Sequence, residues 1–397
     1  MSVPEVATTV TRPTSTASRS RSRVRVLHFY KDYLPASTGG IEQTIYQMCE
    51  AGADMGIESN VLSLAPHGRG DERKIGRHRS TQVKRNLQIA STGFSTSVFQ
   101  AFKRLAKQAD VIHYHYPWPF MDVVHFATRI RKPTVVTYHS DVVRQKLLFK
   151  LYKPLQQRFL RSVDRIVATS PNYVKHSAVL QQYQDKVDVV PIGLDRASYP
   201  RASAEHINHW RKRLPERFFL FVGVLRYYKG LHILVEAARL SGLPVVIAGS
   251  GPCEQELKQS IKRSGLKNVH LVGPIPEEDK VALQTLCGAV VLPSHLRSEA
   301  FGVSLLEGAM TGKPMISCEI GTGTSFVNLD QQTGLVVDPN NPEQLAEALK
   351  TLWDNPQLAK TLGEAAERRF SQCFTAQKMV SQYAGIYEDV LAQRRTR

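Results

Sequence analysis

The pattern that most constrains this chain is a repeated alternation of short apolar runs with longer segments of helical periodicity. The runs are of strand length and rich in Val, Ile and Leu. They lie at 24–29, 59–64, 111–114, 134–138, 165–168 and 187–190, and then at 218–224, 244–248, 269–272, 289–292, 314–318 and 334–337. Buried strands alternating with helices are typical of parallel sheets that carry helices on both faces. The sequence therefore predicts an α/β fold.

The alternation is interrupted once, where Pro-Ile-Gly-Leu-Asp and a polar stretch occupy residues 191–217. A chain of 397 residues is also long for a single core, so two domains are expected. We predict two doubly wound, Rossmann-like domains at 24–195 and 218–375, a linker at 196–217, and a C-terminal helix at 376–397 that packs back on the first domain. Ligands of such sheets bind beyond the carboxyl ends of the strands, so the domains should face each other across a cleft.

The chain has 52 Lys and Arg against 35 Asp and Glu, a formal net charge of +17. Nucleic acid, anionic lipid and phosphorylated substrates are the partners that such a charge suits. Much of the excess lies at 1–23, 69–85 and 144–165, and none of these stretches interleaves aromatic with basic residues as nucleic-acid platforms do. We therefore expect no nucleic-acid partner. The first stretch, rich in Ser, Thr and Arg, is predicted to be a disordered basic tail.

Targeting and cysteine patterns favour a cytoplasmic protein. No apolar run approaches the roughly 18 residues of a membrane span, and the first residues lack the apolar core of a signal peptide. Five scattered cysteines form neither a metal motif nor a disulfide framework. In Arg144–Arg165, Leu and Phe mix with cations at helical spacing. This is either an ordinary helix with a solvated face or a face for anionic lipid, which would make the protein peripheral on the inner face of the cytoplasmic membrane.

The segment from Ser298 to Met310 is the main indication of function. It follows an apolar run, places Glu299 in a loop and begins a helix near Gly302. The free N–H groups of a helix start suit a diphosphate, and glycine allows the ligand to approach the backbone closely. Glu307 follows eight residues after the first glutamate, and carboxylates accept hydrogen bonds from sugar and ribose hydroxyls. The alternative is a helix with two solvated glutamates.

The phrase Glu-Ala-Phe-Gly-(x)3-Leu-Glu, followed by Gly-Lys-Pro, resembles the donor-site signature of retaining glycosyltransferase family 4, which has the GT-B fold. The resemblance extends over about residues 24–390. It implies that Glu299 binds hydroxyls of the transferred sugar, that Glu307 binds the nucleotide ribose, and that the backbone of Phe301, Gly302 and Val303 meets the distal phosphate. It also implies transfer without a metal ion or other cofactor.

Residues 321–328, together with 225–230, resemble more narrowly the bacterial mannosyl- and rhamnosyltransferases of O-antigen and exopolysaccharide assembly. This resemblance implies a GDP-sugar donor and a growing, lipid-linked oligosaccharide acceptor. It also implies front-face attack with retention of configuration, in which the leaving phosphate takes the acceptor proton. A non-catalytic sugar-nucleotide-binding protein and an epimerase or phosphorylase of the same fold are the alternatives.

Two cations are predicted to bind the diphosphate. Lys229 lies where the stretch 221–230 passes from a strand into a helix, so its amine can neutralise a phosphate as a point charge. The family usually carries Arg immediately after the first glycine of this stretch, but here that position is Val224. Arg226 is the predicted substitute, unless its side chain points into solvent.

The opposite wall of the cleft is predicted from Gly39 and Gly40, which follow the first apolar run and allow close backbone approach to a phosphate of the donor or to the acceptor; the alternative is an ordinary turn. Glu42 belongs either to the site or only to the start of the first helix. His139 ends the fourth run, and the resemblance implies that it lies beside the donor sugar; the alternative is a core histidine.

Three further polar residues are harder to interpret. Asp141 either belongs to the site or caps the following helix. His113 and His115 share one face of their run, which suggests a metal, but further ligands at a recognisable spacing are missing. We therefore interpret these two as a wall of the acceptor cleft.

Overall fold

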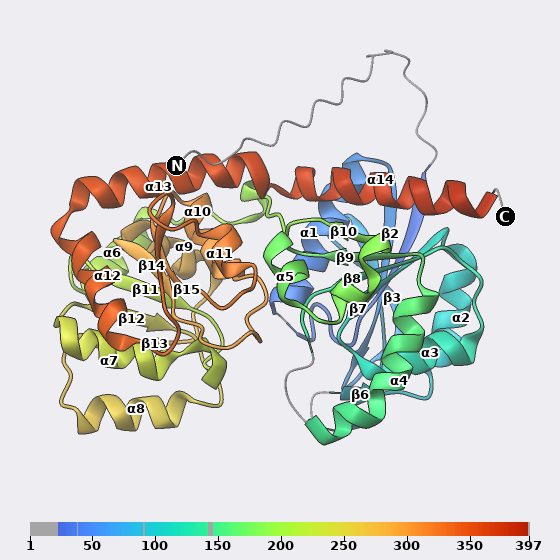
Figure 1. Ribbon diagram of the computed structural model, residues 1–397, viewed down its shortest axis with the longest axis horizontal. Helices are drawn as coiled ribbons and strands as arrows, with labels where there is room; N and C mark the ends of the chain where they lie inside the picture. Colours follow the sequence, from blue (N-terminus) through green and yellow to red (C-terminus); the bar gives the residue numbers. More distant parts are fainter. Residues whose placement is uncertain (1–22, 38, 90–91, 142–145, 396–397) are drawn as a thin grey trace, which may run out of the picture.

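The computed structural model describes residues 23–37, 39–89, 92–141 and 146–395. Apart from its last residue, the predicted tail lies outside these ranges, as do positions 144 and 145 of the basic segment. Figure 1 shows two α/β halves side by side, with the last two helices of the chain running along one edge, one on each half.

The N-terminal half is built on an eight-stranded sheet with the order β10-β9-β8-β7-β1-β2-β4-β3. Its strands are β1 Val24–Phe29, β2 Ile57–Ala65, β3 Arg69–Ile75, β4 His78–Lys84, β7 Val111–Tyr116, β8 Thr134–Tyr138, β9 Arg165–Ala168 and β10 Val187–Val189. The helices are α1 Gly40–Asp54, α2 Val98–Gln108, α3 Pro119–Thr128, α4 Lys146–Ser162 and α5 Pro171–His176, followed by the 3-10 helix Leu180–Lys186. All strand pairs are parallel except β3–β4.

The C-terminal half is built on a parallel six-stranded sheet with the order β13-β12-β11-β14-β15-β16. Its strands are β11 Phe219–Val222, β12 Val245–Ala248, β13 Val269–Gly273, β14 Ala289–Leu292, β15 Met315–Cys318 and β16 Gly334–Val337. The helices are α7 Leu231–Ser241, α8 Glu254–Arg263, α9 Glu277–Leu286, α10 Val303–Met310, α11 Thr324–Val327, α12 Pro342–Asp354 and α13 Pro356–Cys373. The predicted fold class, two doubly wound Rossmann-like halves, is confirmed.

Every predicted strand forms within two residues of its expected ends, but a hairpin was not expected. Strands β3 and β4 form an antiparallel pair that extends the N-terminal sheet, and a small pair, β5 Leu87–Ile89 with β6 Thr92–Phe94, follows it. Most side chains of β3 are exposed and charged, so this edge lacks the apolar run by which the other strands were recognised.

The predicted linker at 196–217 is a structured part of the C-terminal half. It contains the 3-10 helix Arg196–Ser198 and helix α6 Ala204–Arg211. Trp210 is buried there in a cluster with Phe218 and Leu283, and its indole N–H donates to Asp279 of α9 at 3.0 Å. Trp210, with the partly buried Ile207 and Leu214 packed against the same cluster, therefore holds this largely polar stretch on the domain.

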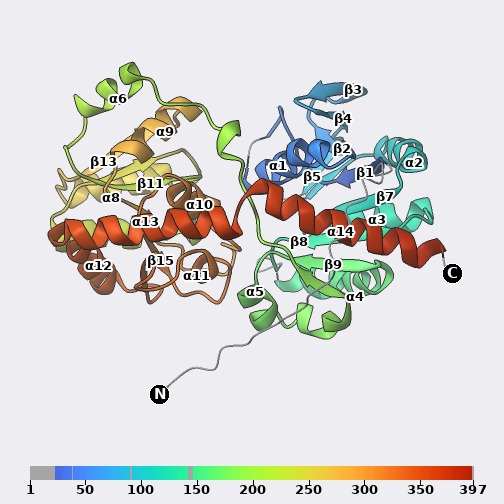
Figure 2. The same ribbon diagram turned by 90° about the horizontal axis from the view of Figure 1, so that it is seen from above.

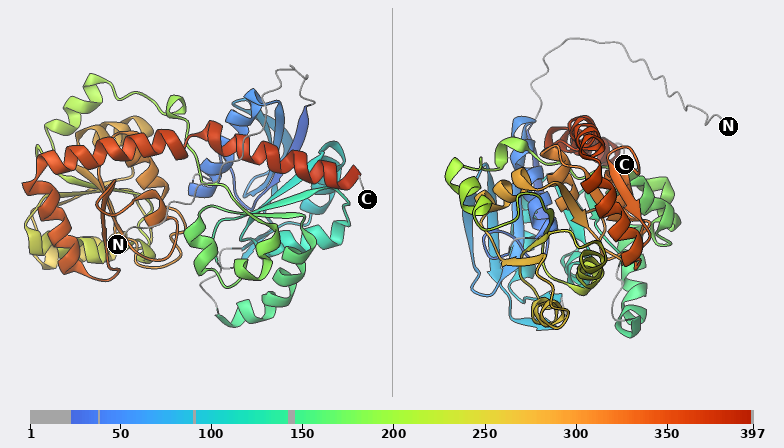
Figure 3. Two further views of the ribbon diagram at one scale, coloured as in Figure 1. Left: turned by 45° about the horizontal axis from the view of Figure 1, so that its top comes forward. Right: turned by 90° about the vertical axis from the view of Figure 1, so that its left-hand side faces the viewer.

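The last helix, α14 Ala376–Arg395, returns to the N-terminal half and runs along it (Figures 2 and 3). Its apolar side chains, among them Met379, Tyr383 and Tyr387, pack with Val26 and Val111 of the N-terminal sheet. The two passages of the chain between the halves pair with each other, since Leu194 N–H donates to Phe374 O and Ala376 N–H to Leu194 O. Among the described helices, none has the length and apolar character of a membrane span.

Candidate functional site

The start of helix α10 faces the N-terminal half at close range. Gly302 precedes the helix with a φ of 87°, a conformation that favours glycine. The first N–H groups of a helix have no intrahelical acceptor and carry partial positive charge. A β-carbon on Gly40, at the start of α1, would lie only 3.6 Å from Val303 Cγ2. The structure therefore brings the predicted residues Gly39 and Gly40 together with Phe301, Gly302 and Val303.

Glu299 and Lys229 form a buried ion pair beside this helix start. Lys229 Nζ donates to Glu299 Oε2, which also accepts a hydrogen bond from Ser294 Oγ at 3.2 Å. Burial alone would lower the pKa of Lys229, but the charge and hydrogen bond of Glu299, together with Tyr228, outweigh it, and the pKa lies above its ordinary value. The two residues predicted to bind diphosphate and sugar thus form an ion pair with each other.

The geometry of the lysine depends on Gly230, the residue after it. Gly230 has a φ of 71°, and a β-carbon there would lie 2.0 Å from the carbonyl oxygen of Pro293. The 3-10 turn Tyr227–Lys229 therefore lies directly against the end of β14, just before the loop that holds Glu299. Only glycine permits this close approach.

Glu307 lies in a second buried ionic network on α10. Its Oε1 accepts from Lys280 Nζ at 2.7 Å and from the hydroxyl of Tyr199 at 3.1 Å, while Gln284 Nε2 lies 3.4 Å from Oε2. Burial lowers the pKa of Lys280, but the charges of Glu307 and Glu277 raise it by more. The carboxylate is thus held in one orientation by the side chains of Lys280, Tyr199 and Gln284, as a ribose-binding acceptor requires.

Arg226 and Val224 lie at the surface of the same loop. Both are exposed, and within the described residues Arg226 has no ion-pair partner. The arginine charge nevertheless lowers the pKa of Lys229 slightly, so the two cations share one electrostatic environment. A role for Arg226 as the substitute phosphate ligand stays a prediction.

On the N-terminal side, His139 directly follows β8 and is only 4% exposed. Its Nε2 is hydrogen-bonded to His115 Nδ1 at 3.0 Å, and burial lowers its pKa to about 3. Gly39 lies against Glu42, whose carboxylate accepts from Ser37 Oγ at 2.8 Å and has a pKa raised by burial. This part of the site therefore consists of a neutral imidazole, a buried carboxyl group and glycine backbone.

An ion pair between the two halves lies close to Glu299 and His139 in the sequence. Arg297 Nη2 lies 3.4 Å from Asp141 Oδ2. Arg297 is two residues before Glu299, and Asp141 is two residues after His139. Asp141 also accepts hydrogen bonds from Tyr138 and Ser177 at 2.9 Å each. Its backbone N–H donates to the hydroxyl of Tyr173 at 2.6 Å, and the residues directly after it lie outside the described ranges. The contact places the loop of Glu299 against the end of β8.

The structure corrects the interpretation of His113 and His115. Both are fully buried inside the N-terminal half, beneath the cleft, and do not form its wall. With His28 they place one ring nitrogen each within 4.8 Å of one another, a spacing at which three ligands can hold a metal. Their ring nitrogens are, however, already used in hydrogen bonds to each other or to neighbouring hydroxyls.

The chain matches known families over both halves. Residues 38–198 match the model described as Glycosyltransferase Family 4, and residues 203–369 match glycosyl transferases group 1. D-rhamnosyltransferase WbpZ of Pseudomonas aeruginosa is 55% identical over 353 residues, 89% of this chain and 93% of that protein. The chain belongs to glycosyltransferase family 4. O-antigen chain mannosyltransferase C of Escherichia coli is 49% identical over 94% of this family 4 chain and all of that protein.

Solved structures support the fold of this family 4 glycosyltransferase. Sucrose-phosphate synthase from Thermosynechococcus elongatus superposes with a TM-score of 0.77 at 20% identity, covering 94% of this chain and all of that one. HepE of Anabaena in complex with UDP-glucose gives 0.71 at 19% identity, over 92% of this chain and all of that one. The predicted family and its narrower resemblance to mannosyl- and rhamnosyltransferases are confirmed.

Sequence reasoning did not find several residues of the site in this glycosyltransferase. Lys280 and Tyr199 bind Glu307, Arg297 bridges the halves, and His28 joins the buried histidines. Only Lys280 carries a local signal, since it is a lysine on the apolar side of helix α9 and is 9% exposed. The others come together from distant parts of the chain.

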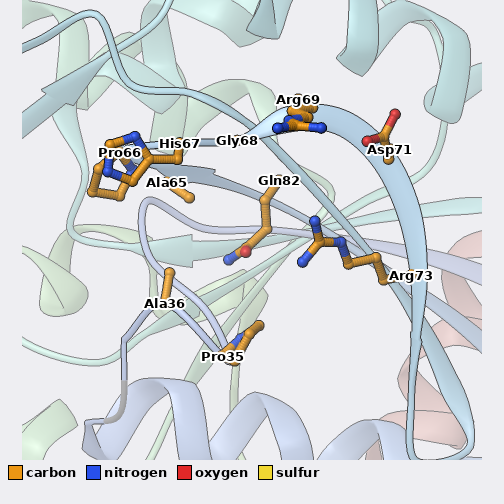
Figure 4. Close-up of a pocket in the computed structure, with 10 residues that line it drawn as sticks. All are labelled: Pro35, Ala36, Ala65, Pro66, His67, Gly68, Arg69, Asp71, Arg73 and Gln82. Carbon is orange, nitrogen blue, oxygen red and sulfur yellow. The ribbon is translucent and has the colours of Figure 1, made fainter.

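A separate pocket of about 490 Å³ opens at the carboxyl ends of β1 and β2 in the same half of the enzyme as His139. Figure 4 shows Arg73 and Gln82 pointing into it, opposite the loop of Pro35 and Ala36, with Arg69 at its rim. In the described structure Arg69 and Arg73 have no ion-pair partner. The pocket thus offers two free guanidinium groups beside an apolar floor.

Proposed function

We propose that this glycosyltransferase moves a hexose, mannose or rhamnose, from a GDP-sugar to a growing lipid-linked polysaccharide, with retention of anomeric configuration. The observation that carries the proposal is the buried Lys229–Glu299 pair beside the start of α10, opposite Gly40. The choice of mannose or rhamnose and of a polysaccharide acceptor is supported by the names of the two relatives, a rhamnosyltransferase and an O-antigen chain mannosyltransferase.

Binding of the donor exchanges the partners of the ion pair. The diphosphate lies at the N–H groups of α10 and takes the charge of Lys229, while Glu299 turns to the hydroxyls of the hexose. Glu307, already oriented by Lys280 and Tyr199, accepts the ribose hydroxyls. Neither carboxylate is left without a hydrogen-bond donor during this exchange, so a desolvated charge is avoided.

Transfer then follows from positioning and charge stabilisation. The acceptor hydroxyl attacks the anomeric carbon on the face that the diphosphate leaves, and the departing phosphate oxygen takes its proton. Lys229 and the helix start stabilise the negative charge that develops on the diphosphate. His139 is neutral, so it can hydrogen-bond the hexose without adding a charge beside the anomeric centre.

The acceptor is proposed to enter through the pocket between β2 and the loop of Pro35. Guanidinium groups bind the phosphates of a lipid carrier in bidentate fashion, and the prolines offer an apolar surface to a sugar face. Helix α4 supports attachment to anionic lipid, since Leu151 is 78% exposed among exposed Lys153, Arg158 and Arg161. The proposed location is the cytoplasmic side of the membrane.

The proposal is tested by incubating the purified protein with GDP-mannose, GDP-rhamnose, UDP-glucose and dTDP-rhamnose and a lipid-linked oligosaccharide acceptor. We expect extension of the acceptor by one GDP-derived hexose, with the anomeric configuration retained when read by proton NMR. Consumption of donor without acceptor would indicate an epimerase, and a requirement for inorganic phosphate would indicate a phosphorylase. Either result contradicts the proposal.

Membrane attachment is tested separately by sedimentation with vesicles at low salt. We expect the protein to sediment with anionic vesicles and to lose this binding when Lys153, Arg158 and Arg161 are replaced by Gln. Equal binding to neutral and anionic vesicles, or no binding, would contradict attachment through charge.

A further inference from the structure

A continuous row of imidazoles leads from the donor site into the N-terminal half. His139 Nε2 is hydrogen-bonded to His115 Nδ1 at 3.0 Å, and His115 Nε2 to His28 Nδ1 at 3.1 Å. The far nitrogen of His28 lies 3.5 Å from Ser59 Oγ, at the long limit of a hydrogen bond. His28, His115 and His139 thus form one hydrogen-bonded row, although the first and the last of them are 111 residues apart in the sequence.

The pairing of the strands β1, β7 and β8 places these histidines next to one another. His28 on β1 pairs with His113 on β7, and His115 pairs with Thr137 on β8, two residues before His139. Residues two apart on a strand point to the same face, so β7 alone presents two imidazoles there. The rings of His115 and His139 stack at a centroid distance of 5.3 Å and an angle of 23°, which keeps their facing nitrogens in line.

All three imidazoles are neutral at physiological pH. Burial lowers the pKa of His28 and of His139 to about 3, and it lowers the pKa of His115 well below its ordinary value. A neutral imidazole has one N–H, so it donates at one nitrogen and accepts at the other. Within such a row, the direction of one hydrogen bond fixes the direction of every other.

We propose that His115 and His28 are positioning residues that hold His139 in a single neutral tautomer. In that tautomer Nδ1 of His139 keeps one role toward the donor hexose, either as hydrogen-bond donor or as acceptor. Within the described residues Nδ1 of His139 has no partner, so it is the nitrogen left for a ligand. This inference rests on the proposed role of His139 in donor binding. A free imidazole at this place would divide between two tautomers, of which one would present the wrong group to the sugar hydroxyl.

His113 supplies an internal comparison, because it lies between the same strands but belongs to a second hydrogen-bond row. Its Nδ1 bonds to the hydroxyl of Tyr387 at 2.6 Å and its Nε2 to Thr137 Oγ1 at 2.7 Å, which in turn bonds to Tyr383. His113 is as completely buried as His115 and has no hydrogen bond to it. Its removal therefore costs packing but leaves the row of His139 intact.

The test compares His28→Leu with the matched control His113→Leu, each of which removes one buried imidazole from a paired position of the sheet. In wild-type protein labelled with ¹⁵N-histidine and free of substrate, we expect one protonated and one unprotonated ring nitrogen for His139. In His28→Leu the two ring shifts should move toward each other, and kcat should fall about tenfold while the KM for the sugar nucleotide changes by less than about twofold. His113→Leu should leave both readouts unchanged.

His28→Asn is the conservative rescue, because the asparagine amide reaches the position of the imidazole Nδ1. It should restore two separate ¹⁵N ring shifts for His139 and most of kcat. If His28→Leu does not fold, Ser59→Ala is the milder variant, because it removes only the hydroxyl at the end of the row. Unmoved His139 shifts in both variants, or the same change in His113→Leu, would overturn the proposal. So would a stoichiometric metal ion in the purified protein, since it would occupy the nitrogens of the row.

The NMR readout needs no substrate, so it separates this inference from the proposed function. A fixed tautomer in a protein that transfers no sugar would contradict only the function. Transfer by a wild-type protein whose His139 already averages between tautomers would contradict only the row.

Discussion

The two walls of the donor site are built by opposite physical means. In the C-terminal half, Glu299 and Glu307 are charged and each is compensated by a buried lysine. In the N-terminal half, His139 and the imidazoles behind it are buried so completely that they are neutral. The difference matches the ligand, since the nucleotide diphosphate is anionic and the transferred hexose is not.

The comparison also indicates what the donor changes. The C-terminal wall has lysines that can exchange a carboxylate for a phosphate without losing a partner. On the N-terminal wall His139 is neutral, so its contribution lies in the direction of its hydrogen bonds. Variants of the first wall should therefore act on transfer and nucleotide binding, and variants of the second on orientation and on pH dependence.

The largest effect is expected from breaking the ion pair of the C-terminal wall. Glu299→Gln or Lys229→Ala should lower kcat at least about 100-fold, because a hydroxyl ligand or the charge on the leaving diphosphate is lost. Steady-state transfer assays on folded protein measure this. Glu236→Gln, which removes a carboxylate from the exposed pair with Arg239, is the control and should be neutral. Near-normal turnover in either site variant would remove the assignment.

A smaller effect, on binding, is expected at the second glutamate. Glu307→Gln should raise the KM or Kd for the sugar nucleotide about tenfold or more, since a charged hydrogen bond to the ribose is worth about 1.5–3 kcal/mol. Lys280 keeps Glu277 as a partner, so the fold should be retained. Glu277→Gln changes the other carboxylate on the same lysine and should shift the Kd by less than about twofold. Equal effects of the two would contradict a ribose role.

The neutral wall predicts a pH dependence of stability. The pKa values of His28 and His139 are about 3 when folded, against an ordinary 6.5, so the unfolded chain binds more protons between these limits. Each histidine should therefore cost up to about 1.4 kcal/mol of unfolding free energy per pH unit below 6.5. Urea denaturation from pH 7 to 5 measures the slope. His28→Leu should reduce this slope by the contribution of one proton. An unchanged slope would contradict burial of His28 in the neutral form.

The smallest effect is expected at the exposed cation of the phosphate loop. Arg226→Ala should lower kcat/KM about two- to fivefold, the range of an exposed charge near a diphosphate. Val224→Arg, which restores the usual family residue, should compensate in the double variant. No change in Arg226→Ala would mean that Lys229 and the helix start bind the diphosphate alone.

Much of the fold could be predicted, because its signals are local. Each buried parallel strand is a contiguous apolar run, so β1, β8 and β14 were found at their observed residues. The hairpin β3–β4 was missed because its outer strand is polar, and helix α6 because one tryptophan anchors it. Glu299, Lys229 and His139 were found through motifs that adjoin strand ends.

The hydrogen bonds and ion pairs between the residues of the site could not be predicted from the sequence. It could not show that Glu299 and Lys229, 70 residues apart, neutralise each other, or that Tyr199 from the presumed linker binds Glu307. His113 and His115 were interpreted as an exposed wall of the cleft. The alternation of side chains along a strand shows which residues share a face of the sheet, but not whether that face is buried.

The sequence by itself determined the parallel α/β architecture, the family and the residues proposed to meet the donor, because these depend on local apolar runs and contiguous motifs. Only the tertiary structure decided which of those residues are charged, which are neutral and how they are aimed. Burial and hydrogen-bond partners set these properties, and both arise where strands distant in the chain become neighbours in the sheet.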